Sequence, residues 1–275
     1  GFSPCDKAPN RQQTYMVAGR PWTPRNANHS RYGQMVPLSW GLAQSNNWIS
    51  AYLMSKLNPS QFVQLLHDYG INNPDIHASL SLCLGPCEVS VSEMVSAYTA
   101  FANHGIRTAP MFVSRIEDNE GNTIATFQPR MNEVISADNA MKMLTMMMGV
   151  VDNGTAGRLR YRYKLEGQIG AKTGTTNNNS DGWFIGFTPQ LVSGCWVGGE
   201  DRDIHFDSMS MGQGATMALP IWAIFMKKVY ADVSLGYSPE VKFDIPADYN
   251  PCYHVGSGGE QDSFEQVNAI DEVFE

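Results

Sequence analysis

Apolar positions three and four residues apart recur in five stretches of the chain, and this spacing predicts amphipathic helices. Two of the stretches begin with clear signals. Asn58-Pro59 offers a cap followed by a proline in the first turn, and Ser90 with Glu93 fits a capping box. The predicted helices cover residues 42–56, 59–69, 90–104, 136–153 and 215–230.

Two groups of strands lie between these helices. Residues 111–116 and 123–127 flank Asp-Asn-Glu-Gly and predict a hairpin. Residues 170–176, 182–187 and 191–197 are separated by short polar links and predict an antiparallel meander. Helices before and after such a meander predict an α+β fold, an antiparallel sheet packed by helices, rather than repeated βαβ units.

Composition narrows the function classes. With 19 Lys+Arg against 27 Asp+Glu, the chain carries a net charge of −8, the opposite of what nucleic-acid binding requires. No apolar run reaches the roughly 18 residues needed to span a bilayer, and the first residues lack the pattern of a signal peptide. Residues 259–275 hold six acidic groups and no Lys or Arg, which predicts a solvated tail.

Cysteine and histidine usage gives no metal site. The five cysteines cannot all pair with one another, and Cys83 and Cys87, the one close pair, have no second pair of ligands for zinc. The six histidines show no i, i+4 pairing with an acid. We therefore expect no metal and no cofactor.

Two short motifs carry candidate chemistry, 127 residues apart (172 − 45). The first is Ser45-Asn46-Asn47, at the predicted start of a helix, and the second is Lys172-Thr173-Gly174, in a predicted strand. A hydroxyl both donates and accepts hydrogen bonds, so Ser45 can pass a proton between a nucleophile and a leaving group. Asn47 can offer its amide to a substrate backbone.

The strand motif supplies binding groups. Lys172 places a positive charge where a substrate carboxylate can sit, and the hydroxyl of Thr173 or Thr175 can bind that carboxylate. Gly174 has no side chain, so a peptide can lie against the strand and pair with its backbone. The Thr175 amide can then face a developing oxyanion.

Longer matches make the chain resemble the C-terminal part of the transpeptidase domain of class A, bifunctional penicillin-binding proteins. The resemblance covers residues 1–230, and its longest stretches are Leu42-Ala-Gln-Ser-Asn-Asn47, Gly170-Ala-Lys-Thr-Gly-Thr-Thr176 and Asp181-Gly-Trp-Phe184. Shorter ones are Trp22-x-Pro24-x-Asn26, Glu93-Met-Val-Ser-Ala-Tyr98, Gly154-Thr155, Gly186-Phe-Thr-Pro189 and Trp196-Val-Gly198. The resemblance implies the penicillin-binding, serine β-lactamase-like fold, with Ser45, Asn47 and Lys172 as catalytic residues and Thr173, Gly174 and Thr175 as substrate-binding residues.

One element of the family's pattern is missing. Its nucleophile lies in a Ser-x-x-Lys motif before the Ser-x-Asn motif, and no Ser-x-x-Lys occurs in this chain. We therefore expect a domain truncated at its N-terminus, with residues 1–246 forming its remainder and residues 247–275 an acidic flexible tail. This fragment alone is expected to be inactive.

The resemblance implies a D,D-transpeptidase that cross-links peptidoglycan stem peptides through a serine acyl-enzyme and binds β-lactams. For the full-length protein, the resemblance implies a preceding glycosyltransferase domain that uses a lipid-linked precursor. It also implies a membrane anchor, with the protein on the periplasmic side of the inner membrane. Two alternatives stay open. A serine β-lactamase-like hydrolase would add an acidic residue that activates water, which no motif identifies. A non-catalytic envelope module would bind peptides at the sheet edge.

Overall fold

A computed structural model of the chain describes residues 1–253. Its centre is an antiparallel sheet with the strand order β11-β10-β9, formed by β9 (Gly170–Thr175), β10 (Asp181–Phe187) and β11 (Val192–Gly198). The register pairs Lys172 with Ile185 and Gly174 with Trp183. The predicted meander is confirmed, and β9 is one of the two edge strands of this sheet.

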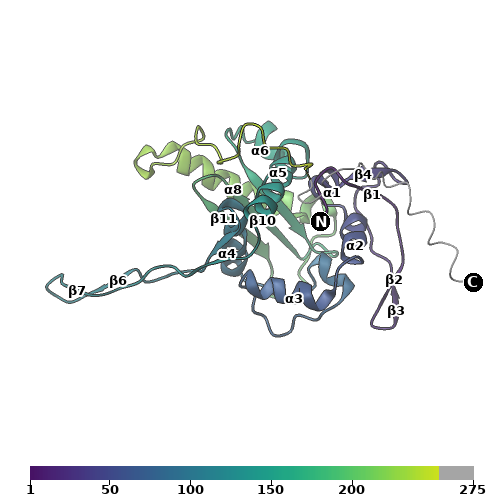
Figure 1. Cartoon of the computed structure of the whole chain (residues 1–275), viewed down its shortest axis with the longest axis horizontal. Coiled ribbons are helices and arrows are strands. Elements are labelled where there is room, and N and C mark those ends of the chain that lie inside the picture. Colours follow the sequence, from purple (N-terminus) through teal and green to yellow (C-terminus); the bar gives the residue numbers. More distant parts are fainter. Residues whose placement is uncertain (254–275) are drawn as a thin grey trace, which may run out of the picture.

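Helices cover both faces of the sheet (Figure 1). On one face, α4 (Val91–Ala102) contacts β11 and α5 (Ala137–Asn153) contacts β9. On the other face, α8 (Gly214–Ala231) packs across all three strands. The predicted α+β fold, an antiparallel sheet packed by helices, is confirmed.

Buried apolar side chains from these layers form the largest core cluster. Phe184 of β10 is fully buried and packs against Trp222 of α8, with ring centroids 5.2 Å apart and the planes tilted by 57°. Gly186 lies beneath the same Trp222 ring, where an added Cβ would come within 2.5 Å of it. Close packing of this kind fixes the distance between α8 and the sheet.

A second, mostly helical region lies beside the sheet. It contains α2 (Asn47–Met54), α3 (Pro59–Asp68) and the 3-10 helix η1 (Leu80–Leu84). The predicted signals at the ends of α3 and α4 are confirmed, because Asn58 caps α3 and the Ser90–Glu93 capping box is formed. Tyr69 and Ala100 are among the residues that bury a small core here.

The prediction of one helix over residues 42–56 was wrong. The chain forms α1 (Leu38–Ala43), turns through residues 44–46, and starts α2 at Asn47. The Asn46 side chain accepts hydrogen bonds from two backbone amides of α2, so it starts a new helix rather than continuing α1. Apolar residues keep their helical spacing on both sides of the turn, so the spacing alone did not reveal the break between the two helices.

The remaining short elements lie at the periphery. The predicted hairpin is present as β6 (Arg115–Glu117) and β7 (Thr123–Thr126), and it extends well away from the body (Figure 1). The other elements are β1 (Lys7–Pro9), β2 (Tyr15–Val17), β3 (Arg20–Trp22), β4 (Met35–Pro37), β5 (Ile106–Thr108), β8 (Met131–Glu133), α6 (Arg158–Tyr161), α7 (Met209–Gly212) and η2 (Val233–Leu235).

The two ends of the described chain are joined. Cys5 and Cys252 form a disulfide, and Tyr249 donates a hydrogen bond to the Asp138 carbonyl at the start of α5. Residues 247–253 of the predicted tail are therefore attached to the domain, and its remainder, residues 254–275, lies outside the described residues. Within residues 1–253, no helix has the length and apolar character to cross a membrane.

Candidate active site

Ser45 lies at the centre of the turn between α1 and α2. Its amide donates to Leu42 O at 3.0 Å, and the amide of Asn46 donates to Gly41 O at 2.9 Å, which closes the end of α1. Ser45 adopts a left-handed conformation with φ of 52°. Glycine usually occupies this position after a helix, so a serine here accepts some backbone strain and points to a role for its side chain.

The structure brings Ser45 and Lys172 together. The Lys172 Nζ donates hydrogen bonds to Ser45 Oγ and to the Thr173 carbonyl, each at 2.7 Å. The ammonium is held between the turn and the edge strand, and burial lowers the pKa of Lys172 from 10.5 to about 8. Burial shifts a lysine in this direction because it disfavours the charged form.

No carboxylate within the described part of the chain forms an ion pair with this ammonium. Within residues 1–253, the ion pairs involve other basic groups, and Lys172 joins none of them. At pH 7 a group with a pKa of about 8 is still mostly protonated. The positive charge is therefore available to an anionic ligand, and Ser45, which accepts its bond from Lys172, can still donate its own proton elsewhere.

Asn47 is fixed by an extended segment that crosses the start of α2. Its Nδ2 donates to Arg25 O at 2.7 Å, and its backbone amide donates to the Asn26 side chain at 3.0 Å. Among the described residues, no hydrogen bond is made to Asn47 Oδ1. This oxygen is the group that Asn47 can offer to a ligand's N–H.

The three residues after Lys172 occupy different environments. Thr173 is only 9% exposed, and its hydroxyl shares a hydrogen bond with Thr155 Oγ1 at 2.8 Å. Gly174 packs on Trp183, where a Cβ would lie 3.0 Å from the Trp183 Cβ. Thr175 is exposed, and its Oγ1 accepts from the Gly214 amide at 3.0 Å, so the hydroxyl proton is free to point outward.

The chain that carries this arrangement of Ser45 and Lys172 matches a known family model. The model "Penicillin binding protein transpeptidase domain" covers residues 2–193, most of the chain and both candidate motifs. The chain belongs to the penicillin-binding protein transpeptidase family.

Curated relatives agree with this assignment. The chain is 32% identical over 236 residues to penicillin-binding protein 1A of Aquifex aeolicus, covering 85% of this chain and 31% of the relative. It is 33% identical over 214 residues to penicillin-binding protein 1A of Neisseria meningitidis, covering 76% of this chain and 26% of the relative. The chain thus spans about a third or less of these relatives' length, and the predicted resemblance to class A penicillin-binding proteins is confirmed.

Solved structures support the penicillin-binding fold. Penicillin-binding protein 1A of Haemophilus influenzae aligns with a TM-score of 0.79 at 24% identity, over 90% of this chain and 41% of that one. The penicillin-binding protein PonA1 of Mycobacterium tuberculosis aligns with a TM-score of 0.68 at 23% identity, over 84% of this chain and 65% of that one. The chain therefore has the fold of these penicillin-binding proteins.

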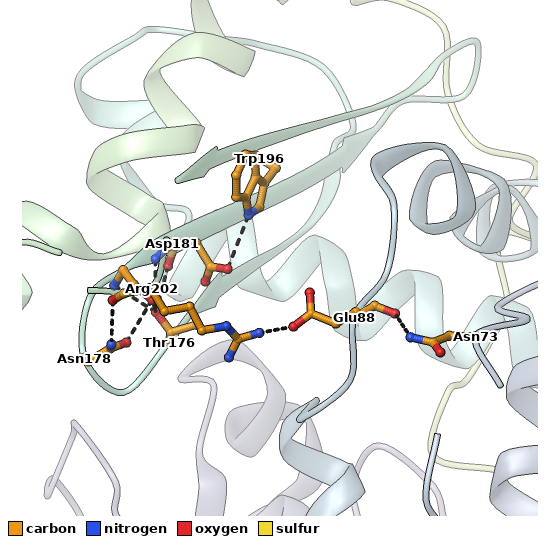
Figure 2. A network of polar contacts seen from close by, with 8 residues as sticks. Asn73, Glu88, Thr176, Asn178, Asp181, Trp196 and Arg202 are labelled. Carbon is orange, nitrogen blue, oxygen red and sulfur yellow. Dashed lines mark hydrogen bonds and ion pairs between the residues drawn. The ribbon is translucent and has the colours of Figure 1, made fainter. Parts of the chain in front are cut away.

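A second polar network lies where β9 of this transpeptidase domain leads into β10 (Figure 2). The guanidinium of Arg202 forms an ion pair with Glu88, and the carbonyl of Arg202 accepts from Asn178 Nδ2 at 3.2 Å. The Glu88 carbonyl accepts from Asn73 Nδ2 at 2.8 Å. The network connects the loop after β9 with the helical region, but the ion pair is exposed and contributes little to stability.

Several residues that shape the site were not predicted to do so. Arg25 and Asn26, which hold Asn47, and Thr155, which holds Thr173, appeared in the sequence only as parts of longer matches. Gln44 was not singled out, although its side chain joins the Ser45 turn to the end of α5. Their contributions are made by backbone carbonyls or by contacts distant in sequence, and no local pattern indicates such contacts.

Proposed function

We propose that this chain is part of a D,D-transpeptidase that cross-links peptidoglycan stem peptides through a serine acyl-enzyme. The observation that carries the proposal is the 2.7 Å hydrogen bond from Lys172 Nζ to Ser45 Oγ. It joins two motifs 127 residues apart in the sequence. The Ser-x-x-Lys nucleophile of the family is absent from these 275 residues, and we propose that it precedes them in the full-length protein.

In this proposal Ser45 passes a proton between the attacking and leaving groups. Lys172 donates to Ser45 Oγ, which leaves the Ser45 proton free to move toward the amine that departs from the substrate. The charge of Lys172 stabilises negative charge that develops on the neighbouring oxygens. A pKa of about 8 keeps the lysine close to the range in which a proton relay works at neutral pH.

The open edge of β9 would bind the peptide. Gly174 allows a substrate strand to approach the backbone, and Asn47 Oδ1 would accept from its N–H. Thr175 would donate its outward-pointing hydroxyl proton to the substrate's terminal carboxylate, and its amide would face the oxyanion. Thr173 would position the strand rather than bind substrate, because its hydroxyl is buried against Thr155.

The wider setting is also a proposal. Residues 1–246 would form the remainder of the transpeptidase domain, and residues 247–275 an acidic tail whose beginning is held by the Cys5–Cys252 disulfide. The full-length protein would carry a membrane anchor and a glycosyltransferase domain that uses a lipid-linked precursor, on the periplasmic side of the inner membrane. The disulfide supports an oxidising, extracytoplasmic location.

Labelling with a fluorescent penicillin tests this function. We expect the 275-residue chain to remain unlabelled, and the longest polypeptide that the gene encodes to be acylated and to deacylate slowly. Fast turnover of penicillin by that polypeptide would instead identify a β-lactamase-like hydrolase. If neither polypeptide is labelled, the result would favour a peptide-binding module without catalytic activity.

A further inference from the structure

The segment that follows α5 touches both halves of the proposed site. The Thr155 amide donates to Ala43 O at 3.0 Å, in the last turn of the helix that leads to Ser45. The Thr155 hydroxyl shares a 2.8 Å hydrogen bond with the hydroxyl of Thr173, the residue after Lys172. A single threonine thus joins the turn that carries Ser45 to the strand that carries Lys172.

The approach between these segments is as close as the backbone allows. A Cβ at Gly154 would lie 2.2 Å from Ala43 O, which is well inside contact distance. Gln44 Nε2 also donates to Asn153 O at 3.0 Å. Two hydrogen bonds, at Asn153 and Thr155, therefore join the end of α5 to residues 43 and 44, and only a glycine fits at position 154 between them.

The contact is also partly shielded from water. Thr173 is 9% exposed, and Ala156, the residue after Thr155, is fully buried. A hydroxyl left without its partner in this part-buried place is destabilising, because water replaces the lost bond only in part. If β9 shifts so that the Thr173 hydroxyl finds another partner, this cost is avoided, but Lys172 on the same strand moves as well.

We propose that Thr155 is a positioning residue for the transpeptidase reaction. Its amide and hydroxyl together fix the separation between the Ser45 turn and β9, so that the Lys172 ammonium stays on Ser45 Oγ. Small displacements matter here, since a shift of about 1 Å between reacting groups can cost about 100-fold in rate. This inference rests on the proposed function, and its test is arranged so that the two can fail separately.

The test compares three variants of the longest encoded polypeptide. Thr155→Val removes the hydroxyl and keeps the shape and the backbone amide, whereas Thr155→Ser keeps the hydroxyl. Thr145→Val is the matched control. It removes a half-buried hydroxyl that bonds Lys142 O at 2.8 Å, ten residues earlier in the chain and on α5 itself.

Acylation by penicillin is measured with the acylation rate constant separated from the non-covalent dissociation constant. We expect Thr155→Val to lower the acylation rate constant about tenfold with a nearly unchanged dissociation constant, and both other variants to stay within about twofold of wild type. A reduction below fivefold in Thr155→Val overturns the inference. An equal reduction in Thr145→Val, or no rescue by Thr155→Ser, also overturns it.

A second measurement on the 275-residue chain is independent of acylation. The pKa of Lys172 is followed by NMR titration of its side-chain signals. Burial holds this pKa low, so a strand that moves away from the Ser45 turn admits water and raises it. We expect a rise of at least half a unit in Thr155→Val alone. If wild type fails to acylate, the proposed function fails, and this titration decides the role of Thr155.

Discussion

Lys172 is the residue on which the proposed chemistry depends, and its environment makes a prediction about stability. Burial lowers its pKa to about 8 in the folded chain, against 10.5 in the unfolded chain. Between these values the unfolded chain binds more protons, so the free energy of unfolding rises with pH. The penalty for the buried charge is fully present below pH 8 and is relieved as the pH approaches 10.5.

Lys172→Met lacks this titration. We expect the free energy of unfolding of wild type, relative to Lys172→Met, to increase between pH 8 and pH 10.5. Urea denaturation at four pH values in this range measures the difference. A constant difference would mean that Lys172 titrates alike in the folded and unfolded chains, and it would contradict the lowered pKa.

The sequence predicted the residue pair but not its geometry. Ser45 and Lys172 were identified from their motifs, and in the structure Lys172 Nζ lies 2.7 Å from Ser45 Oγ. Their catalytic roles, with the roles predicted for Asn47, Thr173, Gly174 and Thr175, stay predictions. The left-handed conformation of Ser45 and the bond from Thr155 to Thr173 could not be predicted, because they depend on contacts between segments far apart in sequence.

At the scale of elements, the sheet and its covering helices were predictable because capping residues and turns mark their ends. Asn58, Ser90 and Ser136 each cap the helix that the pattern predicted. The break between α1 and α2 was missed because it retains helical spacing of apolar residues. The left-handed conformation of Ser45 and the side-chain cap of Asn46 separate the two helices.

The β6–β7 hairpin gives a prediction for an element that contributes little to stability. Its side chains are largely exposed, with Ile116 at 45% and Ile124 at 67%, and it extends away from the body (Figure 1). Elements with few buried apolar contacts sit at the low end of local stability. We expect that replacing residues 112–127 by a short Gly-Ser turn changes the free energy of unfolding by less than about 1 kcal/mol.

Thermal and urea unfolding of the shortened chain, with wild type measured alongside, test this prediction. A loss of several kcal/mol would show that the hairpin supports α4 or the sheet. The penicillin acylation rate of the full-length protein should be unchanged by the same deletion, since the hairpin contributes no residue to the site described here.

At the scale of the molecule, the Cys5–Cys252 disulfide joins the two ends of the described chain across 247 residues. A cross-link that closes a long loop stabilises mainly by restricting the unfolded chain. Cysteine spacing did not predict this pair, because its partners meet only after the whole domain has folded. Cys83, Cys87 and Cys195 remain free thiols.

We expect the double variant Cys5→Ser/Cys252→Ser to lose about 2–4 kcal/mol of unfolding free energy. For a chain of this size such a loss lowers the Tm by about 4–16 °C, at roughly 2–4 °C per kcal/mol. Cys195→Ser, which removes a free thiol, is the control and should change the Tm little. A reducing agent should lower the Tm of wild type and leave the double variant unaffected; equal Tm values for all three chains would contradict this account.

The most direct test of the central claim is the effect of Lys172→Ala on acylation. The rate constant for acylation by penicillin is measured in the longest encoded polypeptide, with circular dichroism as the check on folding. If Lys172 and Ser45 form the working pair of the site, the rate falls at least tenfold while the fold is retained. An unchanged rate in a folded variant would contradict the role assigned to Lys172.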